Sequence, residues 1–348
     1  MRVSPLLKAE PFHVSEWVAK IAGGEAKSIL PRLSQLKADR VHTTTPGIDY
    51  CRALCFLHGE GNLMEARQAL LEERRHHTLS TEGADLLYDI NEQVKPFLLP
   101  PKEIQTAHPT FYLLCDALFD HTMLSWGRLF NLYQNVTVLY EGNTLDSIPA
   151  GPIVECGTAG GGSVVLMAVT AMVAEDNFLK QTGHRPPVKE VLSFDTFSGM
   201  PEPSPVDRVC RSDGEEVSAA STFWSTGTCS SGEEAIHKLA RNFNVDKRLT
   251  TVAGKFEQTL PTRQPDFANG IALLHLDADW YDSVRGVLRE LTPVLHLPRH
   301  ISRVQVDDYY YWTGCRKAVD ETLLEWGQRG LTVPRLESID HNAVYMKW

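Results

Sequence analysis

The sequence lacks the features of a disulfide-stabilised or zinc-binding protein. Its seven cysteines are scattered along the chain, and no two of them are spaced as C-x-x-C. An odd number of scattered cysteines is typical of reduced thiols in the cytosol. Residues 1–5 also have no basic stretch leading into an apolar core, so they do not resemble the start of a signal peptide. We therefore expect a cytoplasmic protein.

Positive charge and long apolar runs are also scarce. The chain has 34 Lys and Arg against 44 Asp and Glu, a formal net charge of −10. An acidic chain argues against nucleic-acid and anionic-membrane partners. No run approaches the roughly 18 consecutive apolar residues that a membrane helix needs. The content of 43% hydrophobic and 22% charged residues is typical of a globular protein. The oligomeric state stays open, a homo-oligomer included.

Residues 1–100 are predicted to form an α-helical N-terminal domain. Residues 49–58 and 63–75 are apolar at helical spacing, with a turn between them. The stretch at residues 61–70 resembles half of a tetratricopeptide-type hairpin. Because such repeats need at least ~3 copies to bury a continuous core, a small helical cap is the alternative interpretation.

Three prolines mark the end of this helical region. We expect a further helical segment at residues 82–94, which should end before Pro96, Pro100 and Pro101. The proline cluster predicts a domain boundary near residue 100. Residues 101–150 then form a helical linker, and residues 151–348 form a larger domain.

The pattern of the larger domain predicts an α/β fold. Short β-branched runs alternate with helical segments, which is typical of a mostly parallel, doubly wound sheet. Strands are expected at residues 153–156, 188–194, 249–252, 271–276 and 301–306, and helices at residues 163–174, 233–243, 283–295 and 315–326. Residues 331–339 and 343–348 look like a terminal antiparallel hairpin, which is unlike the standard dinucleotide-binding order.

Residues 196–232 interrupt this alternation. The segment has little periodicity and holds Pro201, Pro203 and Pro205 among many serines and threonines. Irregular insertions of this length are usually functional or disordered. Because this one follows the end of a strand, we expect an active-site loop.

A glycine-rich segment, ECGTAGGGS at residues 155–163, follows the first predicted strand. Glycines let a backbone approach a ligand closely, and the helix that follows offers free N–H groups. The spacing fits neither a Walker loop nor the G-x-G-x-x-G fingerprint. Taken alone, the segment predicts a small ligand at the strand ends, and a packing turn is the alternative.

A carboxylate, Asp195, stands at the end of the second predicted strand. This position suits an acceptor for ribose hydroxyls in a nucleotide-binding fold. Capping a turn is the alternative role for such a residue. The upstream glycine segment favours ribose binding.

The strongest signal is a set of four carboxylates. Asp277 and Asp279 follow the strand at residues 271–276, and Asp307 and Asp308 follow the next strand. Four like charges at one sheet edge are unfavourable unless a cation neutralises them. Oxygen ligands point to Mg²⁺, with Ca²⁺ or Mn²⁺ as alternatives. If the chain stays extended, Asp277 and Asp279 lean towards the same side of the sheet.

Two further features of this region have ordinary interpretations. His275 lies in an apolar strand, where we expect a core histidine with a satisfied hydrogen bond rather than a ligand. The aromatic run at residues 309–312 either lines a pocket or packs as a hydrophobic staple.

The order and spacing of five sequence blocks resemble the macrocin O-methyltransferase family. The blocks are E-x-G with GGS at residues 155–163, DTFSGMP at 195–201, GKFEQTLP at 254–261, LDADWYDS at 276–283, and DDY with GCRKAVD at 307–320. Thr122, Met123, Arg128, Leu129 and Asn131 resemble the family's N-terminal helical lid. The resemblance covers residues 122–348.

The resemblance implies a class I, S-adenosylmethionine- and Mg²⁺-dependent enzyme that methylates sugar hydroxyls in natural product and antibiotic biosynthesis. It implies a Rossmann-like class I methyltransferase sheet that ends in an antiparallel hairpin. Asp277, Asp307 and Asp308 would hold the metal, and Asp279 would be the general base. The residues expected around S-adenosylmethionine are Glu155, Gly157, Ser163, Asp195, Gly254 and Phe256. The partner would be a small hydroxylated molecule.

Three alternatives remain at this point. A catechol-type acceptor would be served by the same metal chemistry as a sugar. A nicotinamide-dependent dehydrogenase would use a similar sheet, although the carboxylate set and the imperfect glycine fingerprint argue against it. A catalytically inert module could recruit a partner through its helical N-terminus, but an inert site has no need for four clustered charges.

Overall fold

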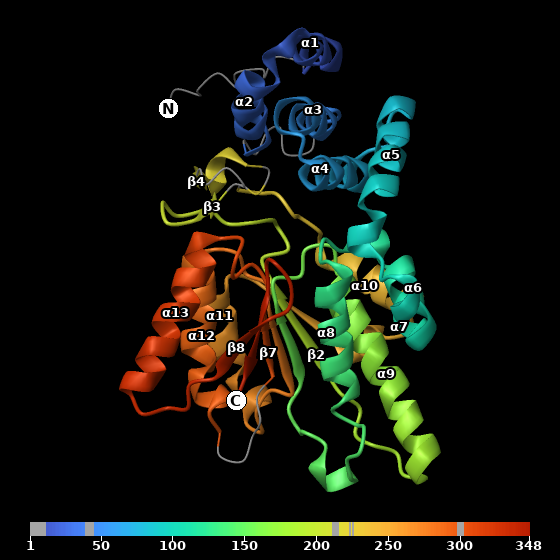
Figure 1. Cartoon of the computed structure of the whole chain (residues 1–348), viewed down its shortest axis with the longest axis vertical. Coiled ribbons are helices and arrows are strands. Elements are labelled where there is room, and N and C mark those ends of the chain that lie inside the picture. Colours follow the sequence, from blue (N-terminus) through green and yellow to red (C-terminus); the bar gives the residue numbers. More distant parts are fainter. Residues whose placement is uncertain (1–11, 39–44, 211–215, 223, 225, 298–302) are drawn as a thin grey trace, which may run out of the picture. The chain divides into compact units, whose positions relative to one another are not determined.

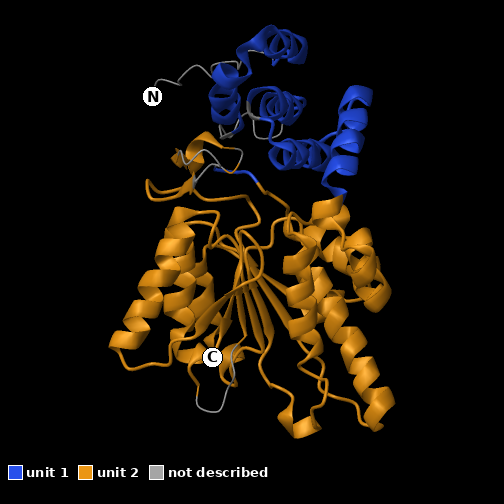
Figure 2. Ribbon diagram, viewed as in Figure 1, with its two compact units in different colours: residues 1–95, 225–228 blue, residues 96–224, 229–348 orange. Residues whose placement is uncertain are grey.

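A computed structural model describes residues 12–38, 45–210, 216–222, 224, 226–297 and 303–348. The chain forms two compact units (Figure 2). Unit 1 consists of residues 1–95 and 225–228, and unit 2 of residues 96–224 and 229–348.

Unit 1 is built from helices. They are α1 (Val14–Lys20), η1 (Ile21–Glu25), α2 (Ala26–Ala38), α3 (Ile48–Cys55), η2 (Phe56–Glu60), α4 (Leu63–His76) and α5 (Thr81–Leu98), whose last three residues belong to unit 2. The two helices predicted around the turn at residues 59–62 are confirmed. Gly61 is left-handed there, and the side chain of Asn62 accepts a hydrogen bond from the backbone N–H of Glu65 at 3.1 Å, which caps α4.

The expectation that a helix ends before Pro96 is wrong. Helix α5 continues through Pro96 to Leu98. A proline inside a helix disturbs only the turn before it, where one backbone hydrogen bond is lost. Because α5 ends two residues after Pro96, little of the helix remains beyond the disturbance.

Unit 2 contains a seven-stranded sheet in the order β5-β2-β1-β6-β7-β9-β8. The strands are β1 (Ile153–Cys156), β2 (Val191–Asp195), β5 (Leu249–Ala253), β6 (Leu273–Leu276), β7 (Val304–Val306), β8 (Arg335–Ser338) and β9 (Val344–Lys347). The first five strands in that order are parallel, and β9 pairs antiparallel with both β7 and β8. The predicted doubly wound sheet with a terminal antiparallel hairpin is therefore confirmed.

Helices cover both faces of this sheet (Figure 1). One face carries α8 (Trp126–Thr137), α9 (Gly162–Thr182) and α10 (Glu233–Asn242). The other carries α11 (Phe256–Thr259), α12 (Tyr281–Leu295) and α13 (Thr313–Gln328). Before α8 come α6 (Lys102–Ala107), α7 (Pro109–Ala117) and η3 (Phe119–His121). The five parallel strands end at one edge, which is where such folds bind ligands.

Helix α9 is the one helix of the described residues that is long and apolar enough to cross a membrane. In the folded protein, however, 72% of the apolar 18-residue stretch of α9 is buried. A core helix that packs against a sheet can have the same length and apolar composition. Both features of α9 are therefore explained by its burial in the core of unit 2.

The segment at residues 196–232 is more regular than expected. It contains β3 (Arg208–Cys210) and β4 (Glu216–Ser218), which pair antiparallel in a separate two-stranded sheet. Hairpin strands as short as these leave almost no periodicity in the sequence, which explains why they were not predicted.

Candidate active site

The glycine segment leads directly from β1 into α9 and lies against the end of β6. Gly157 has a φ of +98°, and a Cβ added there would lie 1.7 Å from the backbone oxygen of Asp277. Gly161 is also left-handed, with a φ of +83°. Only glycine fits at residue 157, so the segment and the first carboxylate of the acidic set are direct neighbours.

The residues expected around a cofactor lie at the carboxyl ends of three adjacent strands. Glu155 is the third residue of β1 and Gly157 directly follows that strand, Asp195 ends β2, and Gly254 follows β5. Ser163 and Phe256 lie in the first turns of the helices that follow β1 and β5, α9 and α11. The fold thus brings all six predicted residues to one edge of the sheet.

Asp195 ties the glycine segment to the end of β2. Its Oδ2 accepts hydrogen bonds from the backbone N–H groups of Thr158 at 2.7 Å and Ala159 at 3.4 Å. Its Oδ1 accepts from the N–H of Phe197 at 2.8 Å and from the hydroxyl of Thr196 at 3.3 Å. The turn-capping interpretation is therefore correct for this structure. Two of the four contacts are long, which leaves room for competing hydroxyl donors.

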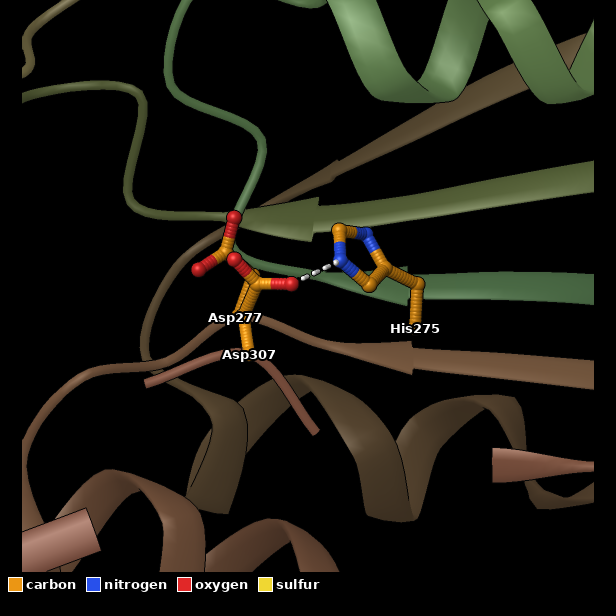
Figure 3. Close-up of side chains that lie close together, drawn as sticks. All are labelled: His275, Asp277 and Asp307. Carbon is orange, nitrogen blue, oxygen red and sulfur yellow. Dashed lines mark hydrogen bonds and ion pairs between the residues drawn. The ribbon is translucent and has the colours of Figure 1, made fainter. Parts of the chain in front are cut away.

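The four predicted carboxylates meet at the ends of β6 and β7. Carboxylate oxygens of Asp277, Asp279 and Asp308 lie within 4.8 Å of one another. Ligand atoms of His275, Asp277 and Asp307 form a second group with the same spacing (Figure 3). Asp307 is buried, and the other three aspartates are half-buried.

Burial and mutual repulsion set the charge of this cluster. They raise the pKa of Asp277 and of Asp279 well above the ordinary value for a carboxyl group. They also raise the pKa of Asp308 to about 6. Burial acts the same way on Asp307, but the guanidinium of Arg128, together with His275 and Gln305, outweighs it and lowers the pKa of Asp307 to about 2. A dication would remove the repulsion among the other three.

The chain does not stay extended between Asp277 and Asp279, so the condition on which strand geometry would place them on the same side is not met. Asp279 is left-handed, with a φ of +55°, and the N–H of Trp280 donates to the carbonyl oxygen of Ala278 at 2.6 Å. A non-glycine residue in this region is strained and is common at functional sites. The tight turn, rather than strand geometry, brings Asp279 back towards Asp277.

Trp312 holds Asp279 in place, a role that the sequence did not reveal. Its indole Nε1 donates a hydrogen bond to Oδ1 of Asp279 at 3.0 Å. The ring is 1% exposed and packs edge-on against Trp280, with 4.8 Å between ring centroids. Trp312 fits neither of the two interpretations of the aromatic run fully, because its indole nitrogen is hydrogen-bonded to a carboxylate of the acidic cluster.

Asp307 is surrounded by donors from three elements. Its Oδ2 pairs with Nη1 of Arg128 from α8. Its Oδ1 accepts from Nε2 of Gln305 at 3.0 Å and faces Nε2 of His275 at 3.4 Å. A carboxylate has about four lone-pair positions, so Asp307 keeps one on Oδ2. Arg128 also pairs with Asp340 of the C-terminal hairpin at 3.1 Å, which links α8 to that hairpin.

His275 is buried and satisfied at both ring nitrogens, as expected for a core histidine. Its Nδ1 lies 2.9 Å from Oε1 of Glu155, and its Nε2 faces Asp307 (Figure 3). Burial lowers the pKa of His275, but hydrogen bonds to Asp307 and Glu155 outweigh this effect and raise it to about 10. The sequence did not reveal that its two partners are predicted site residues.

The segment at residues 196–232 is fastened to residues that flank the carboxylates. Oδ1 of the buried Asp207 accepts from the N–H of Tyr281 at 2.8 Å, at the first residue of α12. The indole of Trp280 donates to the carbonyl oxygen of Pro201 at 3.0 Å. Val209 of β3 forms a backbone bridge with Trp312. The segment therefore braces the same tryptophans that surround Asp279.

The family of this chain follows from its similarity to known protein families. Residues 115–348 match the family described as macrocin-O-methyltransferase (TylF). The chain belongs to this family. The macrocin O-methyltransferase match includes β1, the glycine segment, α8 and all four carboxylates, and it identifies the protein as an O-methyltransferase.

Several solved structures resemble this member of the macrocin O-methyltransferase family. The O-methyltransferase NovP is 26% identical, with 65% of this chain and 81% of that chain covered and a TM-score of 0.48. The calicheamicin methyltransferase CalS11 is 20% identical, with coverages of 79% and 96% and a TM-score of 0.46. TomG from Streptomyces achromogenes, solved with SAM, is 13% identical, with coverages of 74% and 96% and a TM-score of 0.36. No curated protein matches the chain.

Proposed function

We propose that this O-methyltransferase uses S-adenosylmethionine and Mg²⁺ to methylate a hydroxyl of a small molecule, a sugar of a glycosylated natural product. The observation that carries the proposal is the contact between the glycine segment and the acidic cluster. A Cβ on Gly157 would lie 1.7 Å from the backbone oxygen of Asp277. A methyl donor bound at the glycine segment would therefore be a neighbour of a hydroxyl bound at the acidic cluster.

The donor set fits a hard divalent cation. Asp277, Asp307 and Asp308 supply only oxygen atoms, which Mg²⁺ prefers. Asp307 keeps one lone-pair position beside its hydrogen bonds, so it can serve as a one-oxygen ligand. The raised pKa of Asp277 and Asp308 supports the same assignment, because their repulsion is the kind that a cation neutralises.

The strand ends fit S-adenosylmethionine. Oε2 of Glu155 is buried and accepts no hydrogen bond from the residues that the structure describes, so the end of β1 retains an acceptor near the glycine segment. We assign Glu155, Gly157 and Ser163 to the methionine end of the cofactor. Asp195 would accept ribose hydroxyls in place of its two long contacts, and Gly254 and Phe256 would complete the site.

When bound, S-adenosylmethionine supplies an electrophilic methyl group, and Mg²⁺ makes the acceptor hydroxyl more acidic. Asp279 accepts the proton of that hydroxyl. Trp312 donates a hydrogen bond to Oδ1 of Asp279 at 3.0 Å, and we assign Oδ2 to the acceptor. The segment at residues 201–209 braces this arrangement through Trp280 and Trp312.

Methyl transfer from radiolabelled S-adenosylmethionine tests the proposal. The acceptors are a panel of nucleotide-linked sugars, glycosylated macrolides and catechol, together with an extract of the producing organism. We expect labelling of a glycosylated acceptor that is lost in EDTA and restored by Mg²⁺. Transfer that persists in EDTA would disprove metal dependence, and labelling of catechol alone would disprove the sugar assignment.

A matched pair of variants separates the metal site from general charge effects. Asp308→Asn removes a proposed ligand, whereas Asp282→Asn removes an exposed carboxylate in the first turn of α12. We expect Asp308→Asn to raise the Mg²⁺ concentration needed for half-maximal transfer by tenfold or more. Asp282→Asn should leave it unchanged. An equal response of both variants would contradict the assignment.

A further inference from the structure

Three polar side chains stand in one row across the centre of the sheet. Glu155 of β1 is paired in register with His275 of β6, and His275 is paired with Gln305 of β7. Residues in register on parallel strands point to the same face, and so does Asp307, two residues after Gln305. All four side chains are at most 1% exposed. The row runs from the cofactor strand to the metal strand.

His275 is the member of this row that contacts both ends. Its Nδ1 lies 2.9 Å from Glu155, and its Nε2 lies 3.4 Å from Asp307. Figure 3 shows the imidazole directed at the carboxylate of Asp307, with Asp277 beside it. Gln305 also donates to Asp307, at 3.0 Å, and its Oε1 accepts no hydrogen bond from the described residues.

We propose that His275 is a positioning residue that couples cofactor binding to cation binding, by bridging Glu155 and Asp307 through its two ring nitrogens. The inference rests on the proposed function, because it assigns Glu155 to the cofactor end and Asp307 to the cation. In this proposal His275 is a ligand of neither group and acts through these two carboxylates.

The coupling follows from the rigidity of the bridge. The imidazole is a planar ring enclosed in a packed core, so it cannot adjust one hydrogen bond without shifting the other. A cation that fixes Asp307 also fixes the ring, and the ring fixes Glu155 in the position that the cofactor needs. By linkage, each ligand then tightens the binding of the other by the same factor, which is commonly about 5- to 150-fold.

Calorimetry measures this factor without an acceptor. S-adenosylhomocysteine is titrated into the full-length protein in EDTA and again in saturating Mn²⁺. The probe has a neutral sulfur, so direct repulsion between a sulfonium and the metal does not contribute. We expect Mn²⁺ to tighten binding at least about fivefold in the wild type. In His275→Gln, which can reach only one carboxylate, the two Kd values should agree within twofold.

Gln305→Leu is the matched control. It removes a hydrogen bond to the same oxygen of Asp307 but leaves the bridge to Glu155 intact. The ratio of the Kd in EDTA to the Kd in Mn²⁺ should therefore stay at its wild-type value. Glu155→Gln weakens the bridge at its other end and should lose the ratio, as His275→Gln does. If His275→Gln does not fold, the Glu155→Gln ratio decides the question.

The proposal is overturned by a wild-type ratio near one, by a normal ratio in His275→Gln or Glu155→Gln, or by an equal loss in Gln305→Leu. Failure of the proposed function looks different. In that case the wild type binds no S-adenosylhomocysteine, or it binds no Mn²⁺ in a direct titration, and the coupling proposal fails with it.

Discussion

Trp312 donates a hydrogen bond from its indole nitrogen to Oδ1 of Asp279 at 3.0 Å. Asp279 is also held in a left-handed turn, so both its backbone and one of its oxygens are fixed. A general base gains from this arrangement, because its carboxylate is held in one orientation relative to the acceptor.

Trp312→Phe should therefore slow methyl transfer without weakening cofactor binding. An aromatic ring is kept, although it is smaller than the indole, and a hydrogen bond to a charged group, worth about 1.5–3 kcal/mol, is lost. We expect kcat to fall about 10- to 100-fold and the Kd for S-adenosylhomocysteine to stay within twofold. Trp326→Phe is the control: Trp326 is equally buried, but its nitrogen donates to Thr292 at 2.9 Å, away from the carboxylates. Equal losses of kcat in the two variants would contradict the role of Trp312.

Arg128 should be essential to the stability of unit 2. It is buried between Asp307 and Asp340, and Arg128→Met removes the guanidinium that pairs with both carboxylates. Breaking a buried ion pair on one side usually costs about 3–5 kcal/mol. Urea unfolding in EDTA should show a loss of this size. Arg289→Met removes an arginine that is 66% exposed and should change the unfolding free energy by less than about 0.5 kcal/mol. A small loss in Arg128→Met would refute the prediction.

The sequence predicts the four carboxylates because parallel strands end at a common edge. Two of them follow β6 and two follow β7, so their meeting needs only the order of strands in the sheet. The partners of these carboxylates are a different matter. Arg128 and Asp307 are 179 residues apart in the sequence, and no local sequence pattern predicts such a pair. The direction of the Trp312 indole likewise depends on packing against Trp280 and on the bridge to Val209.

Gly157→Ala should disrupt the cofactor site and the metal site together. The new Cβ would lie 1.7 Å from the backbone oxygen of Asp277, at a φ of +98°. The chain must then move, and binding of both S-adenosylhomocysteine and Mn²⁺ should weaken at least tenfold. Gly183→Ala tests strain alone, since Gly183 is left-handed with nothing within 4 Å of the added Cβ. It should cost about 1–2 kcal/mol of stability and leave both affinities unchanged, as calorimetry can establish.

Mg²⁺ should stabilise the protein more at pH 8 than at pH 5. The folded, metal-free state holds the pKa of Asp308 at about 6, above the ordinary 3.8. Between these values the folded state binds more protons than the unfolded state, so its stability falls as pH rises through the window and stays lower above it. Mg²⁺ removes the repulsion that causes this loss. The increase in Tm on adding Mg²⁺ should grow with pH, and Asp308→Asn should flatten the dependence. A constant increase in Tm would argue against cation binding at Asp308.

The last prediction separates Asp279 from Asp277, whose carboxylate oxygens lie within 4.8 Å of each other. If Asp277 is a ligand and Asp279 is the base, the two asparagine variants must differ in kind. Asp279→Asn keeps the side-chain shape, including the oxygen that accepts from Trp312, but removes the basicity. We expect turnover to fall about 10²- to 10⁴-fold, the usual range for a general base, with Mn²⁺ affinity close to wild type. Asp277→Asn should lose Mn²⁺ affinity as well as turnover, because a charged ligand becomes neutral. Electron paramagnetic resonance of free Mn²⁺ gives the affinities, and kcat at saturating metal gives the rates. Normal turnover in Asp279→Asn, or a loss of metal as severe as that in Asp277→Asn, would mean that Asp279 is a ligand or a bystander, and that the proton is accepted elsewhere in the cluster.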